Sequence, residues 1–586
     1  MGKKDVDNEL KVAAEKAIKL DDENTPNKVK QKVGFHIKNL VSTKKRKVLV
    51  TVASILLLLI IAIAVPFTRY AILSPFVKKD VTLKIIDSKT KKPVTNVSIE
   101  IGGVASQSDK DGLVKLNAVP VGQYELNVEK QYYKSYTASY TVPVFTTPES
   151  PTFDINATGR QVSVTISNKI SGEPVADVVI EASGTKATTG SDGAATIILP
   201  PTNETTQAIV KKDGYNAIDV ELKVDESFVN TYSVTPSGSI YYLSKATGKI
   251  NVMKSNLDGS GASVAVAATG QESDYETSLL SSRDWQYSAF NATRTDNKQR
   301  LYLLSSNKDE LSLIDEGDAS FTMVGWSGHN FIYTVYRNTP NPWDNKKQAL
   351  KSFNAETRKL TTLDETVGVG TNSYDSSYEN YSGTYILKDE IVYLKNWYFS
   401  NYYFMNNDNN KAPTLYSVSS LGESKKTVKT FPINKSANLR LYEPQGLYVQ
   451  VSQANNPPVF YEYEDKNIKE VAGINDNQFN SFYPTFLVSP SAKRTLWYEP
   501  RDGKNTLFIG NEAGKEAKTI GTLSEFVPYG WFGQNDEYVL LTKNGSELYI
   551  SPANRAINED GYQPLKVTDY HKTRTYPGYG YGYGGQ

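Results

Sequence analysis

The stretch "SDKDGLVKLNAVPVGQYELNVEK", residues 108–130, contains an acidic turn, a run of alternating apolar residues and a Pro-x-Gly-x-Tyr step. Two interpretations compete for its first residues. Asp109 and Asp111 could ligate a metal ion, or Asp111 and Gly112 could close a tight turn between two strands. The alternation that follows is typical of a strand with one buried face. The neighbouring sequence decides between the two.

The same plan returns 81 residues later, where Asp192-Gly193 takes the place of Asp111-Gly112. The second copy has Gly190 in the position of Asp109, so a metal site that needs both carboxylates would be missing there. Both copies keep the Asp-Gly pair, and a tight turn needs only this pair. Gly tolerates positive φ, and Asp bonds its own turn backbone. Calcium prefers six or more oxygen ligands, and the stretch offers two side chains. The repetition therefore favours a structural turn and predicts no metal site.

These residues also carry a family resemblance. The sequence "IIDSKTKKPVTNVSIEIGGVASQSDKDGLVKLNAVPVGQYELNVEKQYYKSY" resembles a carboxypeptidase regulatory-like domain, of the transthyretin-like or PEGA-like kind. The second copy is similar but has "PPTNETTQAIV" instead of the Pro-x-Gly-x-Tyr step. We therefore expect two tandem Ig-like β-sandwiches, residues 78–158 and 160–235. The resemblance implies a stalk or spacer and transfers no catalytic residues.

The length and composition set further bounds. A chain of 586 residues exceeds what one hydrophobic core usually serves, so several domains are expected. Residues 1–47 carry 13 Lys and Arg against 7 Asp and Glu, and the remainder carries 52 against 57. This mildly acidic body gives no general attraction for nucleic acid, whose binding rests on clustered cations. Cysteine is absent, which excludes disulfides, thiolate nucleophiles and Cys-ligated metals.

One segment is predicted to cross a membrane. The stretch "VLVTVASILLLLIIAIAVPF", residues 48–67, has 20 residues and no charge, which suits a hydrocarbon core about 30 Å thick. "KKRK" at 44–47 precedes it, so the positive-inside rule places residues 1–47 in the cytoplasm as a basic tail. A cleaved signal peptide is the alternative, but such peptides have short leaders and shorter apolar cores. Part of the tail, "NKVKQKVGFHIKNLV", either contacts anionic head groups or is a solvated linker.

The sequence pattern of residues 236–570 is typical of a β-propeller. "GSIYYLSKATGKINVMKSNLDGSGAS" suggests two strands followed by a turn that is common in blades. Gly325-Trp326 is echoed 205 residues later by Gly530-Trp531, which fits repeated units of roughly 40–55 residues. "LVSPSAKRTLWYEPRDGKNTLFIG" resembles the blade turns of TolB-like and WD40-like propellers. The predicted fold is thus all-β, with a transmembrane helix, two sandwiches and a propeller of six or seven blades.

The predicted propeller offers little that points to catalysis. His329 has Gln534 as its counterpart in the repeat, which indicates a structural position. No Gly-x-Ser-x-Gly motif of serine hydrolases occurs. Glu462 and Glu464 lie at strand period and could imitate the acid pair of a glycosidase, although exposed charge pairs on strands are far commoner. We predict no catalytic residue, no cofactor and no metal ligand.

The candidate binding residues lie in "VYLKNWYFSNYYFMNNDNN", residues 392–410. So many aromatic side chains cannot all enter one core through strict alternation, and aromatic groups with polar tips favour contacts with protein or sugar. A wide strand packed between blades is the competing interpretation. The C-terminal segment 571–586, rich in Tyr and Gly, is expected to be disordered. The candidates for partner binding are Trp397, Tyr398, Tyr402, Tyr403 and Phe404.

These features together predict a single-pass protein of the cell membrane, with its N-terminus in the cytoplasm and its bulk outside, in a bacterial envelope. Its partners would be the lipid bilayer and a protein or glycan that the propeller binds or scaffolds, without nucleic acid. Two alternatives remain open. The propeller could be a hydrolase or lyase that acts on envelope polysaccharide, or the protein could be a sensor that relays external binding to the tail.

Overall fold

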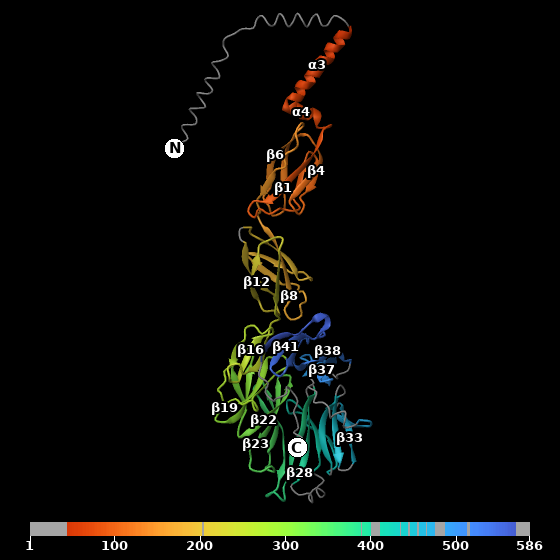
Figure 1. Ribbon diagram of the computed structural model, residues 1–586. Coiled ribbons are helices and arrows are strands. Elements are labelled where there is room, and N and C mark those ends of the chain that lie inside the picture. The colour runs from red at the N-terminus through yellow and green to blue at the C-terminus, as the bar shows by residue number, and fades with distance from the viewer. Residues whose placement is uncertain are drawn as a thin grey trace, which may run out of the picture. The chain divides into compact units, whose positions relative to one another are not determined.

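The computed structural model describes residues 44–569, apart from 202–203, 388–389, 400–410, 434, 443–445, 454–455, 465, 475–486 and 512–515 (Figure 1). The chain divides into two compact units. One comprises residues 1–161 with 198–204, and the other comprises residues 162–197 with 205–586. Residues 1–43 of the predicted tail and the C-terminal segment 571–586 lie outside the described residues. So do three of the candidate residues, Tyr402, Tyr403 and Phe404.

The apolar segment forms helix α3 (Lys44–Ala64), which is followed by the short helix α4 (Pro66–Leu73). The window Lys47–Ala64 is long and apolar enough to cross a membrane, by length and composition. The predicted helix over residues 48–67 is wrong at its C-terminal end. Helix α3 ends at Ala64, and a second helix begins at Pro66. Pro66 has no N–H to donate to the preceding turn, so it begins a new helix instead of extending α3.

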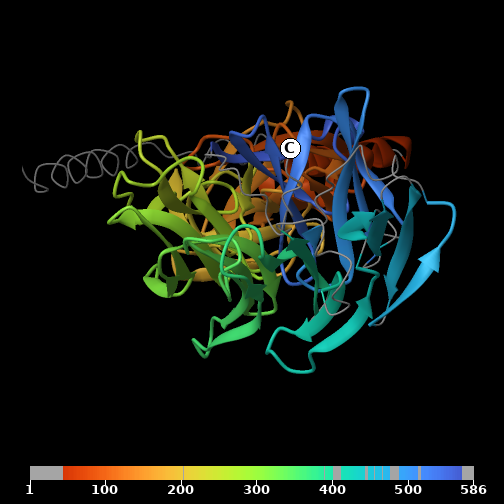
Figure 2. The ribbon, with the colours of Figure 1, turned by 90° about the horizontal axis from the view of Figure 1, so that it is seen from below.

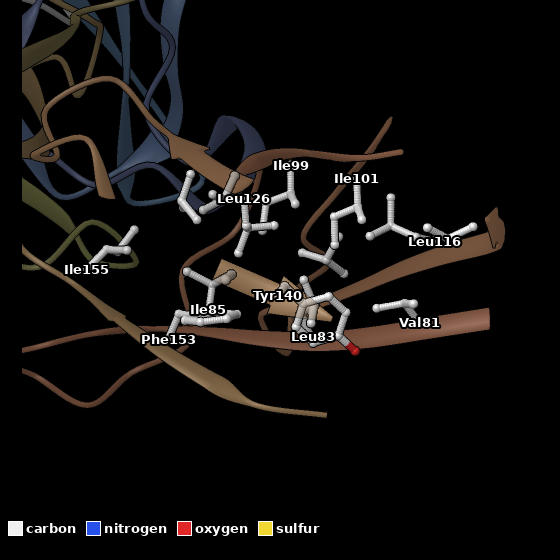
Figure 3. Packing of buried hydrophobic residues seen from close by; sticks show 14 of the residues in the cluster. Val81, Leu83, Ile85, Ile99, Ile101, Leu116, Leu126, Tyr140, Phe153 and Ile155 are labelled. Atoms are coloured by element: carbon white, nitrogen blue, oxygen red, sulfur yellow. The ribbon is translucent and has the colours of Figure 1, made fainter. Parts of the chain in front are cut away.

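The first sandwich consists of two sheets that share one apolar core, shown in Figure 3. Strand β1 alternates buried and exposed residues, so Val81, Leu83 and Ile85 point to the core. Ile99 and Leu126 face them from the other sheet. The three-stranded sheet has the order β4 (Leu113–Pro120), β1 (Lys78–Asp87), β7 (Thr152–Ile155), and the four-stranded sheet β3 (Val104–Gln107), β2 (Ser98–Ile101), β5 (Gly122–Glu129), β6 (Tyr136–Val142).

The second module repeats this topology strand for strand. In both modules the first strand pairs with the last in parallel and with the fourth in a three-stranded sheet. The backbone N–H of Ile85 donates to Gly112 O over 2.8 Å, and Ile166 donates to Gly193 O over the same distance. The second module has a three-stranded sheet in the order β11 (Ala194–Leu199), β8 (Arg160–Asn168), β14 (Val229–Val234). Its four-stranded sheet has the order β10 (Thr185–Thr188), β9 (Val179–Ala182), β12 (Thr205–Lys211), β13 (Ile218–Lys223).

The acidic stretch at residues 108–112 is a turn, as the repeat predicts. One carboxylate oxygen of Asp109 accepts the backbone N–H groups of Asp111 and Leu113, at 2.9 and 3.0 Å. These bonds hold the pKa of Asp109 below its ordinary value. Gly112 and Gly193 both have φ near +72°, a conformation that side chains disfavour. Asp109 therefore stabilises the backbone of the turn between two strands.

Seven sheets follow one another along the rest of the chain and lie around a ring, which Figure 2 shows from below. The propeller thus has seven blades in the described residues. The first four are β15 (Ser239–Ser244), β16 (Asn251–Asn256), β17 (Ser263–Val266); β18 (Ser278–Ser281), β19 (Tyr287–Thr295), β20 (Lys298–Ser305), β21 (Leu311–Glu316); β22 (Ala319–Ser327), β23 (Asn330–Arg337), β24 (Gln348–Asn354), β25 (Leu360–Glu365); and β26 (Gly368–Val369), β27 (Ser377–Leu387), β28 (Glu390–Phe399), β29 (Thr414–Ser419), β30 (Lys426–Thr430).

The last blade closes the ring by packing against the first without sharing a strand with it. Ile240 and Tyr242 of β15 join one buried cluster with Leu540 and Ile550 of the seventh blade. The last three blades are β31 (Ser436–Tyr442), β32 (Gly446–Gln453), β33 (Asn456–Glu464), β34 (Asn467–Val471); β35 (Leu487–Val488), β36 (Arg494–Arg501), β37 (Lys504–Asn511), β38 (Lys518–Ser524); and β39 (Phe526–Phe532), β40 (Tyr538–Lys543), β41 (Glu547–Pro552), β42 (Leu565–Asp569), with a 3-10 turn at Glu559–Gly561.

Candidate binding surface

The two ends of the propeller differ. The second sandwich contacts it at the end where β39 and β40 of blade seven are joined: Asn168 donates to the Tyr538 hydroxyl at 2.8 Å. At the same end Lys169 forms a 2.7 Å ion pair with Asp258. This pairing outweighs burial and lowers the pKa of Asp258 to about 2. We call the opposite end, where β23 is joined to β24 in blade three and β28 to β29 in blade four, the distal end.

The distal end of blades three and four carries an exposed aromatic surface. Tyr374 is 78% exposed and Tyr398 is 46% exposed, and apolar Val369 lies on the neighbouring strand. All its members stand near strand ends or connections at the distal end, so they belong to one edge of two adjacent sheets. We define this distal aromatic surface as Tyr336, Val367, Val369, Tyr374, Tyr378, Trp397 and Tyr398.

The rings of the distal aromatic surface are ordered by strand register. Tyr378 of β27 and Tyr398 of β28 are direct cross-strand partners, and their rings stack with centroids 5.7 Å apart. Burial raises the pKa of Tyr378, and the neighbouring Tyr336 and Tyr398 add to this effect. The Tyr378 phenol therefore stays neutral at physiological pH and can donate or accept a hydrogen bond.

Two lysines lie against the same surface. The Lys347 ammonium is 4.9 Å from the centre of the Tyr336 ring, and the Lys411 ammonium is 5.8 Å from that of Trp397. Cations at these distances are attracted to the ring faces. Lys347 is buried and donates to Thr339 O at 2.6 Å, so Lys411 is the more accessible of the two cations. Trp397 and Tyr398 are consecutive in β28, so their side chains leave opposite faces of the blade. The surface thus offers stacked rings, hydroxyl tips and one lysine at its edge, which suits a ligand with apolar faces and oxygen acceptors.

A buried ionic cluster supports the surface from below. Lys395 of β28 is 5% exposed and lies 2.7 Å from Glu379 and 3.2 Å from Asp364. Burial alone would lower the pKa of Lys395, but the two carboxylates raise it. Asp364 belongs to blade three and is also held by Lys425 at 2.7 Å. These contacts connect blade three to blade four two residues from Trp397, so they fix the base of the surface.

The structure separates the predicted candidates. Trp397 is half-buried and Tyr398 is exposed, so both contribute to the distal aromatic surface. Sequence reasoning missed Tyr336, Tyr374 and Tyr378, which come from other strands. A signal existed in the tyrosine-rich stretch "SYDSSYENYSG", residues 373–383, which enters β27, the partner strand of β28, and forms its first part.

A second concave feature lies where the inner strands of five blades meet. This pocket has a volume of about 120 Å³, and its lining includes Trp285, Trp326, Trp531, Ile386 and Arg283. The tryptophans are fixed by bonds to neighbouring blades. Trp326 Nε1 donates to Leu280 O at 2.9 Å, and Trp531 Nε1 donates to Leu487 O at 2.6 Å. The Gly-Trp echo in the sequence therefore corresponds to a repeated hydrogen bond between neighbouring blades.

His329 is held between two carboxylates. Its Nε2 is 2.7 Å from Asp284 of blade two, and its Nδ1 is 2.6 Å from Glu356 of its own blade. Burial lowers the pKa of His329, but the two carboxylates raise it to a value above the ordinary one. The predicted structural position of His329 fits this role as a clamp between blades.

The paired glutamates have separate surroundings. Glu462 pairs across the sheet with Tyr448 and Lys469, and Glu464 stands at the end of β33 opposite Asn467. In the described residues no group of three or more His, Asp or Glu side chains is arranged to hold a metal ion.

Comparisons with known proteins concern the fold. No family model matches the chain, and no curated protein matches it either. Similar solved structures include a prolyl endopeptidase (11% identity, TM-score 0.32, 60% of this chain and 47% of the other). The propeller of the trilobed protease from Pyrococcus furiosus (10%, 0.33, 63% and 95%) and TolB from Acinetobacter baumannii (12%, 0.27, 58% and 79%) are also similar. The chain spans about half the length of the prolyl endopeptidase, and at these scores the likenesses carry no argument about activity.

Proposed function

We propose that this protein is a membrane-anchored binding protein of the cell envelope, whose propeller recognises a protein or glycan through the distal aromatic surface. The observation that carries the proposal is the exposure of stacked tyrosines at the end of the propeller opposite the second sandwich. Rigid aromatic side chains bury a large area at low entropic cost, and a few of them can dominate an interface.

The remaining parts of the chain receive roles that fit this proposal. Helix α3 is the single membrane anchor, with the basic tail in the cytoplasm and the sandwiches outside. The two sandwiches are spacers of the carboxypeptidase regulatory-like kind. As spacers they would separate the anchor from the propeller along the chain.

Photo-crosslinking in living cells tests the proposal. A benzoylphenylalanine placed at Tyr398 or Tyr374 should give a discrete adduct, whereas the same probe at Tyr275, which is 72% exposed outside this surface, should not. Digestion of the adduct with protease or glycosidase then separates a protein partner from a glycan. The change Tyr398→Ala should weaken binding of the identified partner by about 2 kcal/mol, or roughly thirtyfold.

Two results would reject the surface as the binding site. One is equal cross-linking from Tyr275 and Tyr398, and the other is unchanged affinity of a folded Tyr398→Ala, Tyr374→Ala variant. If purified protein instead released reducing or unsaturated ends from envelope polysaccharide, the hydrolase or lyase alternative would replace a pure binding role. If adding the partner outside the cell changed the conformation of the cytoplasmic tail, the sensor alternative would be favoured.

A further inference from the structure

The first sandwich exposes two phenylalanines at the end that follows α4. Phe76 is 83% exposed and Phe145 is 71% exposed. Phe76 lies just after α4, where its backbone N–H donates to Leu73 O at 3.0 Å. The Arg69 guanidinium of α4 is 5.9 Å from the centre of the Phe145 ring. Both phenylalanines therefore border α4.

Helix α4 has a fixed place on the first sandwich. Tyr70 and Leu73 of α4, together with Val77, pack against the sandwich core. The backbone N–H of Val121 donates to Val77 O at 3.1 Å, which joins the connection after α4 to the β4–β5 turn. The exposed phenylalanines are thus held on a rigid body.

This end of the sandwich lies close to the apolar helix. Helix α3 ends at Ala64, and the eight residues of α4 span about 12 Å at 1.5 Å per residue. The head-group region of each leaflet extends roughly 5–8 Å beyond the hydrocarbon core. Helix α4 turns away from the axis of α3 after Val65 (Figure 1), so Phe76 lies less than this full length beyond the end of α3. If α3 crosses the bilayer, Phe76 and Phe145 are then within reach of the head groups.

Three basic residues lie near the two phenylalanines in the chain or in space. Arg69 forms no ion pair within the described part of the chain, and its Nε is buried without a hydrogen-bond partner there. Lys78 is exposed, and Lys79 donates to Thr146 O at 3.1 Å beside Phe145. Apolar rings next to Lys and Arg match the membrane interface, where the rings enter the acyl boundary and the cations meet lipid phosphates.

We propose that this end of the first sandwich, formed by Arg69, Phe76, Lys78, Lys79 and Phe145, docks onto the phospholipid head groups of the leaflet from which α3 emerges. The first sandwich then rests on the bilayer and does not swing on a free tether. The docking rests on the proposed anchoring role of α3 and is independent of the partner of the propeller.

The absence of cysteine makes a site-specific test direct. The full chain carrying Thr147→Cys, two residues from Phe145, is labelled with an environment-sensitive dye and reconstituted into phosphatidylcholine vesicles with and without phosphatidylglycerol. The matched control is Lys91→Cys, in the turn at the other end of β1. Lipids with nitroxide groups near the head group should quench the dye at position 147 and leave the dye at position 91 unaffected.

A second variant tests the phenylalanines themselves. Adding Phe76→Ser and Phe145→Ser to Thr147→Cys should abolish the quenching while the protein still floats with the vesicles and melts at the same temperature, since both rings are exposed. Equal quenching at positions 147 and 91, or quenching that survives the double change, would overturn the docking. A chain that does not float would overturn the anchor and the docking together.

Discussion

Removal of the buried cation in the change Lys395→Met should destabilise the propeller strongly. Lys395 is 5% exposed, and its partners Asp364 and Glu379 have side chains that are 8% exposed. The variant would leave the Glu379 carboxylate buried without its cation, whereas Asp364 would keep its 2.7 Å pair with Lys425. Breaking a buried pair by removing one partner typically costs about 3–5 kcal/mol. We expect a loss of unfolding free energy in this range.

The control is an ion pair of equal length at the surface. Lys346 lies 2.7 Å from Glu365, as Lys395 does from Glu379, but its side chain is 61% exposed. Exposed pairs contribute about 0–1 kcal/mol, so Lys346→Met should be nearly silent. Because the two ion pairs have the same length, any difference between the variants in lost unfolding free energy reports the effect of burial.

Hydrogen exchange measured by mass spectrometry suits this test, because it reports the free energy of opening for each segment of a multidomain chain. Peptides that cover β25, β27 and β28 should exchange faster in Lys395→Met, whereas peptides of the sandwiches should not change. A loss below about 1 kcal/mol, equal to that of Lys346→Met, would show that water reaches the cluster and would refute the reasoning.

Two further predictions concern pH and topology. The pKa of His329 is raised in the folded state, so the contribution of its charged clamp should be fully present below about pH 6.5 and be lost as pH rises through the folded pKa. The melting temperature of the wild type minus that of His329→Gln should therefore fall with rising pH; a flat difference would contradict this. Protease added outside intact cells should digest the chain after residue 68 and spare the tail, and protection of the propeller would reverse the orientation.

The sequence alone determined the features that depend on near neighbours in the chain. The apolar run, the Asp-Gly turns and the period-two strands each follow from local composition, and duplication made the turn interpretable because Gly190 replaces Asp109 in the second copy. The Gly-Trp echo likewise located equivalent inner strands, which the bonds of Trp326 and Trp531 bear out. The end of α3 also depends on a near neighbour in the chain, since Pro66 begins the next helix.

Only the tertiary structure decided which side chains act together. Tyr336, Tyr374 and Tyr398 come from three different strands or connections of two blades, and strand pairing brings Tyr378 against Tyr398. The sequence shows the tyrosines but not the register. Similarly, Lys395 meets Asp364 across a blade boundary 31 residues away, and nothing local distinguishes it from a surface lysine. Burial and register are properties of the assembled sheets, so the binding surface and its ionic support appear only once the ring is closed.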